Sequence, residues 1–140
     1  MPTDDFVQKL IEMREILEPA AASSASQRCT AKQLDRLDAA YAKMAAARSL
    51  DEWISADLAF HEAMLEATNN DLMVSLFALI EASLGTFFSL SARVADDFRY
   101  SLPHHQKVLD SIRRRQPHAA RSAMQRLIAD SRSNIARNKR

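Results

Sequence analysis

Glycine, proline and aromatic residues are scarce in this sequence, and cysteine is almost absent. One Gly, four Pro and 6% aromatic residues among 140 leave few of the turn and strand formers that a sheet protein needs. The lone Cys29 excludes an internal disulfide and any multi-cysteine zinc module. Because 47% of the residues are hydrophobic and the length suits one domain, the composition predicts a single all-α domain over residues 1–140.

An excess of charge of either sign is also missing. The sequence has 19 Lys and Arg and 18 Asp and Glu, so its net charge of +1 creates no field that would attract a nucleic-acid backbone or an anionic membrane. It has no signal-peptide pattern and no run of about 20 uncharged apolar residues that could span a membrane. Together with the single cysteine, these absences predict a cytoplasmic protein that binds neither a membrane nor, through this segment, DNA.

Helix start and stop signals divide the chain into six segments. The candidate N-caps are Thr3, Thr30 and Ser49, the last with a carboxylate three residues later as in a capping box. Pro103 and Pro117 suit the first turn of a helix, whereas Pro19 should bend the helix that contains it. The six predicted helices cover about residues 4–28, 31–48, 50–69, 71–94, 102–115 and 117–138. The fourth is apolar on more faces than one packing stripe requires, which predicts a central helix or a dimer interface.

Two ionisable residues of the third helix fall on its apolar side. On a helical wheel with Trp53 at zero, the apolar residues span about −20° to 120°, while Asp57 lies near 40° and His61 near 80°. These two residues are four apart, so their side chains stand one turn above each other and can converge on a single atom.

The fifth and first helices show the same pattern. With Leu102 at zero, His105 lies near −60°, at the centre of the apolar arc. With Leu10 at zero, Arg14 lies near 40°, among apolar residues. A buried isolated charge costs several kcal/mol even after relaxation, so these side chains must be paired, bound to metal or facing a wet cavity.

Several interpretations of this set are open. Each His can be a satisfied core residue, and Asp57 can form an interhelical ion pair with Arg14. Together, one carboxylate and two imidazoles suit Zn²⁺, Ni²⁺, Mn²⁺ or Fe²⁺, which describes a binding site or a metal-dependent enzyme with open coordination positions. A structural dimerisation module with buried charges is a third interpretation.

Four segments of the sequence resemble the FCD family, the effector-binding domain of GntR-type bacterial transcription regulators, which is related to the C-terminal domain of the fatty-acid regulator FadR. The segments that carry the resemblance are residues 12–18 (EMREILE), 57–61 (DLAFH) with Asn70 beyond, 105–112 (HQKVLDSI) and 119–124 (AARSAM). The ordered set covers nearly the whole chain, although the D-x-x-x-H element is short by itself.

The resemblance implies an antiparallel bundle around a central ligand cavity, usually dimeric, in which one Asp and three His hold a metal that helps bind a small organic acid. By position, Asp57, His61 and His105 match three of the ligands, but Leu127 stands where the family commonly has the fourth His. Arg14 matches an inward Arg, whose planar fork suits an effector carboxylate. Asn70 also matches, which a place at a helix C-terminus explains.

We therefore expect the ligand-sensing domain of a GntR-family regulator that is not an enzyme and forms a homodimer. Its cofactor would be a divalent metal ion of the Zn, Ni or Mn class, and DNA would be reached only through an N-terminal winged helix-turn-helix that this sequence lacks. The alternatives are a metal-free FadR-like domain that binds an acyl ligand, and a metal-dependent enzyme that uses the Asp/His/His site.

Overall fold

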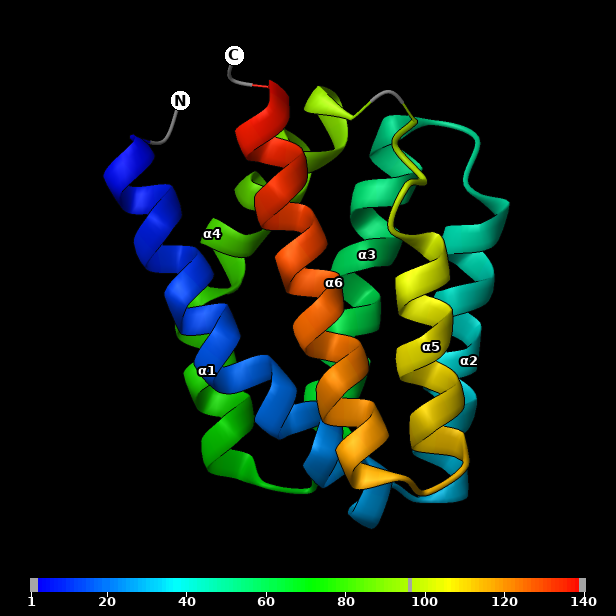
Figure 1. The fold of residues 1–140 in the computed structure, drawn as a ribbon. Helices are drawn as coiled ribbons and strands as arrows, with labels where there is room; N and C mark the ends of the chain where they lie inside the picture. Colours follow the sequence, from blue (N-terminus) through cyan, green and yellow to red (C-terminus); the bar gives the residue numbers. More distant parts are fainter. Residues whose placement is uncertain (1–2, 96, 139–140) are drawn as a thin grey trace.

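The chain folds into a bundle of helices, as the composition predicts. The computed structural model describes residues 3–95 and 97–138, and these form six α-helices and no strand. The helices are α1 (Asp4–Arg28), α2 (Ala31–Ala46), α3 (Leu50–Glu66), α4 (Asp71–Val94), α5 (Leu102–Arg113) and α6 (Pro117–Asn138). The all-α class and the expected six helices are confirmed, and Figure 1 shows the helices lying side by side.

Four pairs of helices make the most extensive contacts: α1 with α6, α2 with α3, α5 with α6, and α3 with α4. The first helix also touches α3 and α5, so residues far apart in the sequence meet in the interior. Trp53, Phe60 and Met64 of α3 are buried there together with Met124 of α6. Burial of these large side chains supplies the main driving force for the bundle.

The observed helix ends differ in detail from the predicted ones. Helix α2 ends two residues before the predicted end. Helix α3 ends at Glu66, because the Oγ1 of Thr68 donates a hydrogen bond to a backbone carbonyl and Asn69 takes a positive φ of 52°. Ser49 caps α3 as expected, but the Glu52 carboxylate accepts from the backbone N–H of Arg48, so the capping box is incomplete.

The expected role of Asn70 at a helix C-terminus is wrong. Asn70 is the N-cap of α4, where its side-chain oxygen accepts from the backbone N–H groups of Leu72 and Met73 at 3.1 and 3.4 Å. The preceding Asn69 fills the C-terminal position in its place, because its positive φ ends the previous helix. Two adjacent asparagines thus divide the two roles between them.

Pro19 lies inside α1 without ending it, since the helix continues to Arg28. Figure 1 shows α1 changing direction about midway along its length, as a missing backbone donor predicts. The bend brings the second half of the helix under α3 and α6.

The exposed large apolar side chains of the described residues all lie on two helices. They are Phe6, Met13 and Ile16 of α1 and Leu72, Leu76 and Leu79 of α4. By length and composition alone α4 could also cross a membrane, but apolar helices of soluble proteins pass the same test. Because the two helices pack against each other, we call these six exposed side chains together the α1–α4 apolar face.

Candidate metal centre

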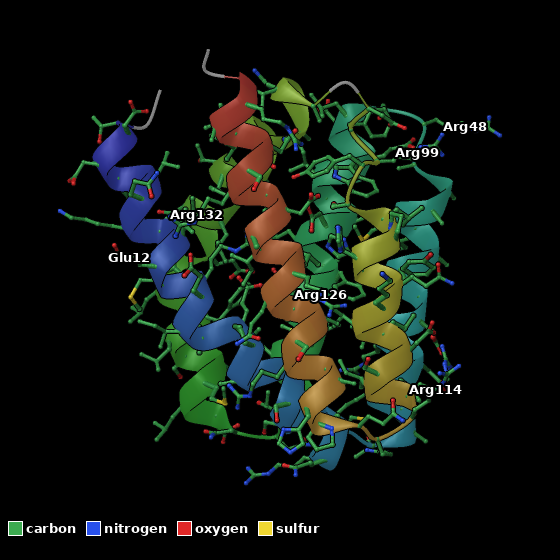
Figure 2. All side chains as sticks on the ribbon, viewed as in Figure 1. Glu12, Arg48, Arg99, Arg114, Arg126 and Arg132 are labelled. Atoms are coloured by element: carbon green, nitrogen blue, oxygen red, sulfur yellow. The ribbon has the colours of Figure 1, made fainter. Side chains whose placement is uncertain are left out.

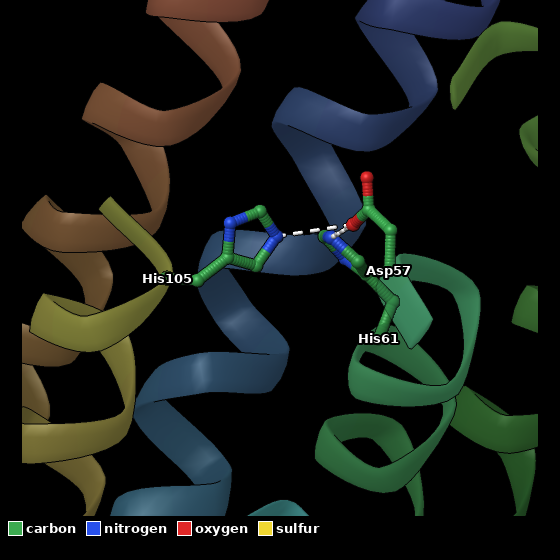
Figure 3. A group of neighbouring side chains, drawn as sticks. All are labelled: Asp57, His61 and His105. Atoms are coloured by element: carbon green, nitrogen blue, oxygen red, sulfur yellow. Dashed lines mark hydrogen bonds and ion pairs between the residues drawn. The ribbon is translucent and has the colours of Figure 1, made fainter. Parts of the chain in front are cut away.

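Three of the inward-facing residues meet at one point between α3 and α5. Asp57, His61 and His105 are 6%, 0% and 1% exposed. Each offers one ligand atom, and these three atoms all lie within 4.8 Å of one another. Figure 3 shows the two side chains of α3 pointing toward His105 on α5. The helical wheel therefore predicted correctly that all three point inward.

A single oxygen of Asp57 faces both imidazole rings. His105 Nε2 lies 3.0 Å from Asp57 Oδ1 and forms a hydrogen bond with it. His61 Nε2 lies 3.2 Å from the same oxygen but does not meet the geometry of a hydrogen bond, and it has no other partner. The Nε2 atom of His61 is thus a buried polar atom without a hydrogen bond, which costs free energy in a dry interior.

The other nitrogen of each ring is already anchored. His105 Nδ1 lies 2.8 Å from the backbone oxygen of Ser101, which can only accept, so Nδ1 donates. His61 Nδ1 contacts the carboxylate of Glu18. A neutral imidazole has one N–H, so when Nδ1 donates in the neutral ring, Nε2 carries a lone pair, and its contact with Asp57 then needs a proton or a cation on Nε2.

This arrangement fits a metal ion. A lone pair facing a carboxylate oxygen is repulsive unless a proton or a cation lies between them. Anchoring Nδ1 to a carboxylate or a backbone carbonyl is also how proteins orient histidine ligands whose Nε2 binds metal. One carboxylate oxygen and two Nε2 atoms are donors that Zn²⁺, Ni²⁺ and Mn²⁺ accept, with further positions open for water or an effector.

Glu18 joins this centre to the first helix. Its Oε1 contacts His61 Nδ1, while its Oε2 accepts from Arg14 Nε at 2.6 Å. Both side chains of this ion pair are fully buried. An ion pair between Asp57 and Arg14 was one of the open interpretations, but Arg14 pairs with Glu18, which lies four positions along the same helix.

The guanidinium of Arg14 is only partly satisfied. Nε is bonded to Glu18, but Nη1 and Nη2 have no hydrogen-bond partner although the side chain is 1% exposed. The guanidinium carbon lies 5.0 Å from the centre of each of two rings, Phe87 and Phe88 of α4. The aromatic faces stabilise the cation but accept no conventional hydrogen bond, so two donor groups stay available for a ligand.

The charges in the centre shift one another's pKa values. Burial alone would raise the pKa of Glu18, but the charges of Arg14 and His61 lower it to about 2. Burial likewise opposes ionisation of Asp57, yet its contacts with His105 and His61 hold its pKa well below the usual range. Burial would lower the pKa of His61, whereas the carboxylates of Glu18 and Asp57 raise it to about 9.

A group of hydroxyl side chains lies near Asp57 and was not predicted. The hydroxyl of Tyr100 contacts Ser91 of α4 and donates to Ser131 of α6 at 3.3 Å. Burial raises the pKa of Tyr100, and the nearby charges of Asp57 and Asp130 add to the effect. Serines on an inward face give little sequence signal, because their hydroxyls also satisfy themselves on their own helix.

Leu127 lies buried on α6 and supplies no ligand atom. The site is closed as well, since its three candidate ligands are almost inaccessible to solvent. A hollow of about 540 Å³ opens between α2 and α3, but it is lined by residues such as Lys43, Asp51 and Ser55, away from the centre. The central ligand cavity therefore stays a prediction, and a ligand could reach the centre only if the side chains or helices around it moved.

Comparison with known proteins gives consistent relatives. The sequence matches the FCD domain over residues 9–130. It is 30% identical over 125 residues to YieP of Escherichia coli, an uncharacterized HTH-type transcriptional regulator, covering 87% of this chain and 53% of that protein. It is 27% identical over 128 residues to the galactonate operon transcriptional repressor of Escherichia coli, covering 90% of this chain and 56% of the repressor. The chain thus spans about half the length of these curated relatives.

Two solved structures share the fold. The GntR protein of Streptococcus agalactiae is 26% identical, with a TM-score of 0.77 over 93% of this chain and 59% of that one. The metal-free FCD domain of TM0439 is 14% identical, with a TM-score of 0.77 over 99% of this chain and 97% of that one. At this low identity, the second likeness shows the fold alone.

The raised pKa of His61 predicts how stability depends on pH when metal is removed. A folded-state pKa of about 9 against an ordinary value of 6.5 means that charged His61 stabilises the fold fully below pH 6.5, and this contribution is lost as pH rises through 9. With EDTA present, we expect the melting temperature to fall by roughly 5 °C or more between pH 6.5 and 9. Scanning calorimetry at matched ionic strength measures it.

The variant His61→Gln should lose most of this slope, even if it is less stable at every pH. The matched control is His118→Gln, because His118 is exposed on α6 and should leave the slope unchanged. A wild-type melting temperature that is flat or rises over this range would contradict the prediction.

Proposed function

Since the chain belongs to the FCD domain family, the effector-binding domains of GntR-type transcription regulators, we propose that it senses a small organic acid bound beside a divalent metal ion. The resemblance noted in the sequence is confirmed, and the relatives are transcription regulators, not enzymes. The name of one relative, a galactonate operon repressor, suggests a sugar acid as a first candidate. We place the protein in the cytoplasm, where a bacterial regulator meets its DNA.

The observation that carries the proposal is the unsatisfied guanidinium of Arg14. Its two terminal nitrogens are buried without partners, and a carboxylate would accept from both through the bidentate geometry that Arg favours. Glu18 cannot fill this role, because it is already bonded to Nε and to His61. An acid that binds here gains a charge-assisted contact in a site from which water is excluded.

Asp57, His61 and His105 would hold the metal ion. When bound, the ion would supply a second positive charge toward which an effector oxygen can turn. The three residues come from α3 and α5, whereas Arg14 comes from α1. An acid bound between them would therefore favour one arrangement of these helices over others. In an intact regulator this shift in population would change how attached DNA-binding domains are placed.

Metal content tests the first half of the proposal. After incubation with zinc and gel filtration, elemental analysis should give about one zinc ion per wild-type chain. His61→Ala should retain almost none, because this variant lacks one of the three ligands. The exposed His118→Ala is the control and should retain zinc. Wild-type protein that retains no zinc would instead favour the metal-free, FadR-like alternative, in keeping with the apolar Leu127.

Acid binding tests the second half. On zinc-loaded protein, a set of small acids that includes galactonate is screened by thermal shift. We expect at least one to raise the melting temperature of the wild type by a few degrees and to have no effect on Arg14→Ala, because the carboxylate loses its fork. The control is Arg48→Ala, since Figure 2 shows Arg48 pointing away from the bundle. Equal shifts in wild type and Arg14→Ala would remove Arg14 from the site.

We also propose that two copies of the chain associate through the α1–α4 apolar face. A soluble domain rarely leaves so many large apolar side chains in water, and a two-fold axis lets one face cover its own copy. Leu79 is 81% exposed in the described chain, so its burial would come only from a second copy or another partner.

The variant Leu79→Glu should convert the dimer to a monomer, because it places a charge in an apolar contact. Sedimentation velocity measures the mass of each species. The control is Ala46→Glu, which adds the same charge at an exposed position of α2. A wild-type chain that is monomeric at every concentration tested would contradict the dimer.

A further inference from the structure

The interior of the bundle carries an uneven set of charges. Among residues 3–95 and 97–138, the buried Asp, Glu, Lys and Arg side chains are Arg14, Glu18 and Asp57. Their charges are one positive and two negative, which leaves one net negative charge in a region that water does not reach. The two buried imidazoles are neutral whenever they bind a metal, since a coordinating nitrogen has no proton.

A divalent ion in this centre changes the sign of the balance. Two positive charges added to one net negative charge leave one net positive charge. An uncompensated charge in a dry interior is costly. The metal-loaded centre is therefore best neutralised by a ligand that carries one negative charge. A ligand with two negative charges would overshoot and leave a net negative charge buried instead.

From this balance, and resting on the proposed function, we infer that the effector is a monocarboxylate whose remaining part is uncharged, and that Glu18 sets this preference by neutralising Arg14. Glu18 would be a positioning and charge-setting residue, since it touches Arg14, which would contact the acid, and His61, which would hold the metal ion. Without the negative charge of Glu18, Arg14 and the metal ion together would favour a dicarboxylate.

Among residues 3–95 and 97–138, Arg14 is the one buried Lys or Arg side chain, so these residues offer no second buried cation of this kind for another carboxylate. Beyond Asp57 lie the hydroxyls of Tyr100, Ser91 and Ser131, which are uncharged donors and acceptors. The nearby His104 is already paired with Asp130, since its Nε2 lies 3.6 Å from Asp130 Oδ2. These groups can accept the hydroxyls of a hydroxy acid, but they cannot compensate a second negative charge.

Matched pairs of acids test the inference on zinc-loaded wild-type protein. Lactate is compared with tartronate, and gluconate with glucarate, because the members of each pair share a carbon frame and differ by one carboxylate. Isothermal titration calorimetry should give a dissociation constant at least about tenfold lower for the monocarboxylate of a pair that binds. A dicarboxylate that binds as tightly or more tightly overturns the inference and leaves the organic-acid function standing.

The variant Glu18→Gln tests the residue that is said to set the charge. Removing one negative charge should move the ratio of the two affinities by about tenfold or more toward the dicarboxylate. The matched control Glu12→Gln removes a charge from the same helix at an exposed position, which Figure 2 shows on the outer side of α1, and should leave the ratio unchanged.

The remaining outcomes are also decisive. An unchanged ratio in zinc-loaded Glu18→Gln overturns the role of Glu18. If that variant fails to fold or to hold zinc, the wild-type comparison of each pair still decides the ligand class. Absence of binding by every acid contradicts the proposed function itself, and the inference with it.

Discussion

One carboxylate oxygen that faces two imidazoles in a dry interior is the constraint on which the rest of the structure depends. Asp57 Oδ1 lies within 3.2 Å of Nε2 of both His61 and His105. Each ring is already anchored at its other nitrogen, by Glu18 and by the backbone of Ser101. The rings cannot turn away without breaking these bonds, so the space between the three atoms calls for a positive charge, whether a proton or a metal ion.

This constraint explains why the buried charges come from three helices. Each charge would be costly alone, and each is compensated by a partner that the fold brings to it. Glu18 is the central member, because it bonds to Arg14 on its own helix and to His61 on α3. The relative position of α1 and α3 is thus fixed by a charged contact in addition to apolar packing, so a ligand bound at the proposed site would act on both helices.

The sequence predicts the fold and the inward direction of the four key residues, and it fails where partners have to be chosen. Periodicity gives the face on which Asp57, His61, His105 and Arg14 lie, because their neighbours at helical spacing are apolar. It does not give the partner across an interface, so the link from Glu18 to His61 was missed although Glu18 lies one turn from Arg14. The anchor of His105 is a backbone oxygen, which no residue type reveals. That Leu127 stands where the family commonly has a fourth histidine ligand came only from the family resemblance.

The closed interior gives α4 a special place in the proposed function. Phe87 and Phe88 of this helix lie against the guanidinium of Arg14, the group that an acid has to reach. The same helix carries Leu72, Leu76 and Leu79 on the α1–α4 apolar face. If an acid shifts α4 as a rigid element through these two rings, the shift would also displace the residues proposed to contact the second copy. Ligand binding and dimer geometry would then be coupled through one helix, without a separate relay.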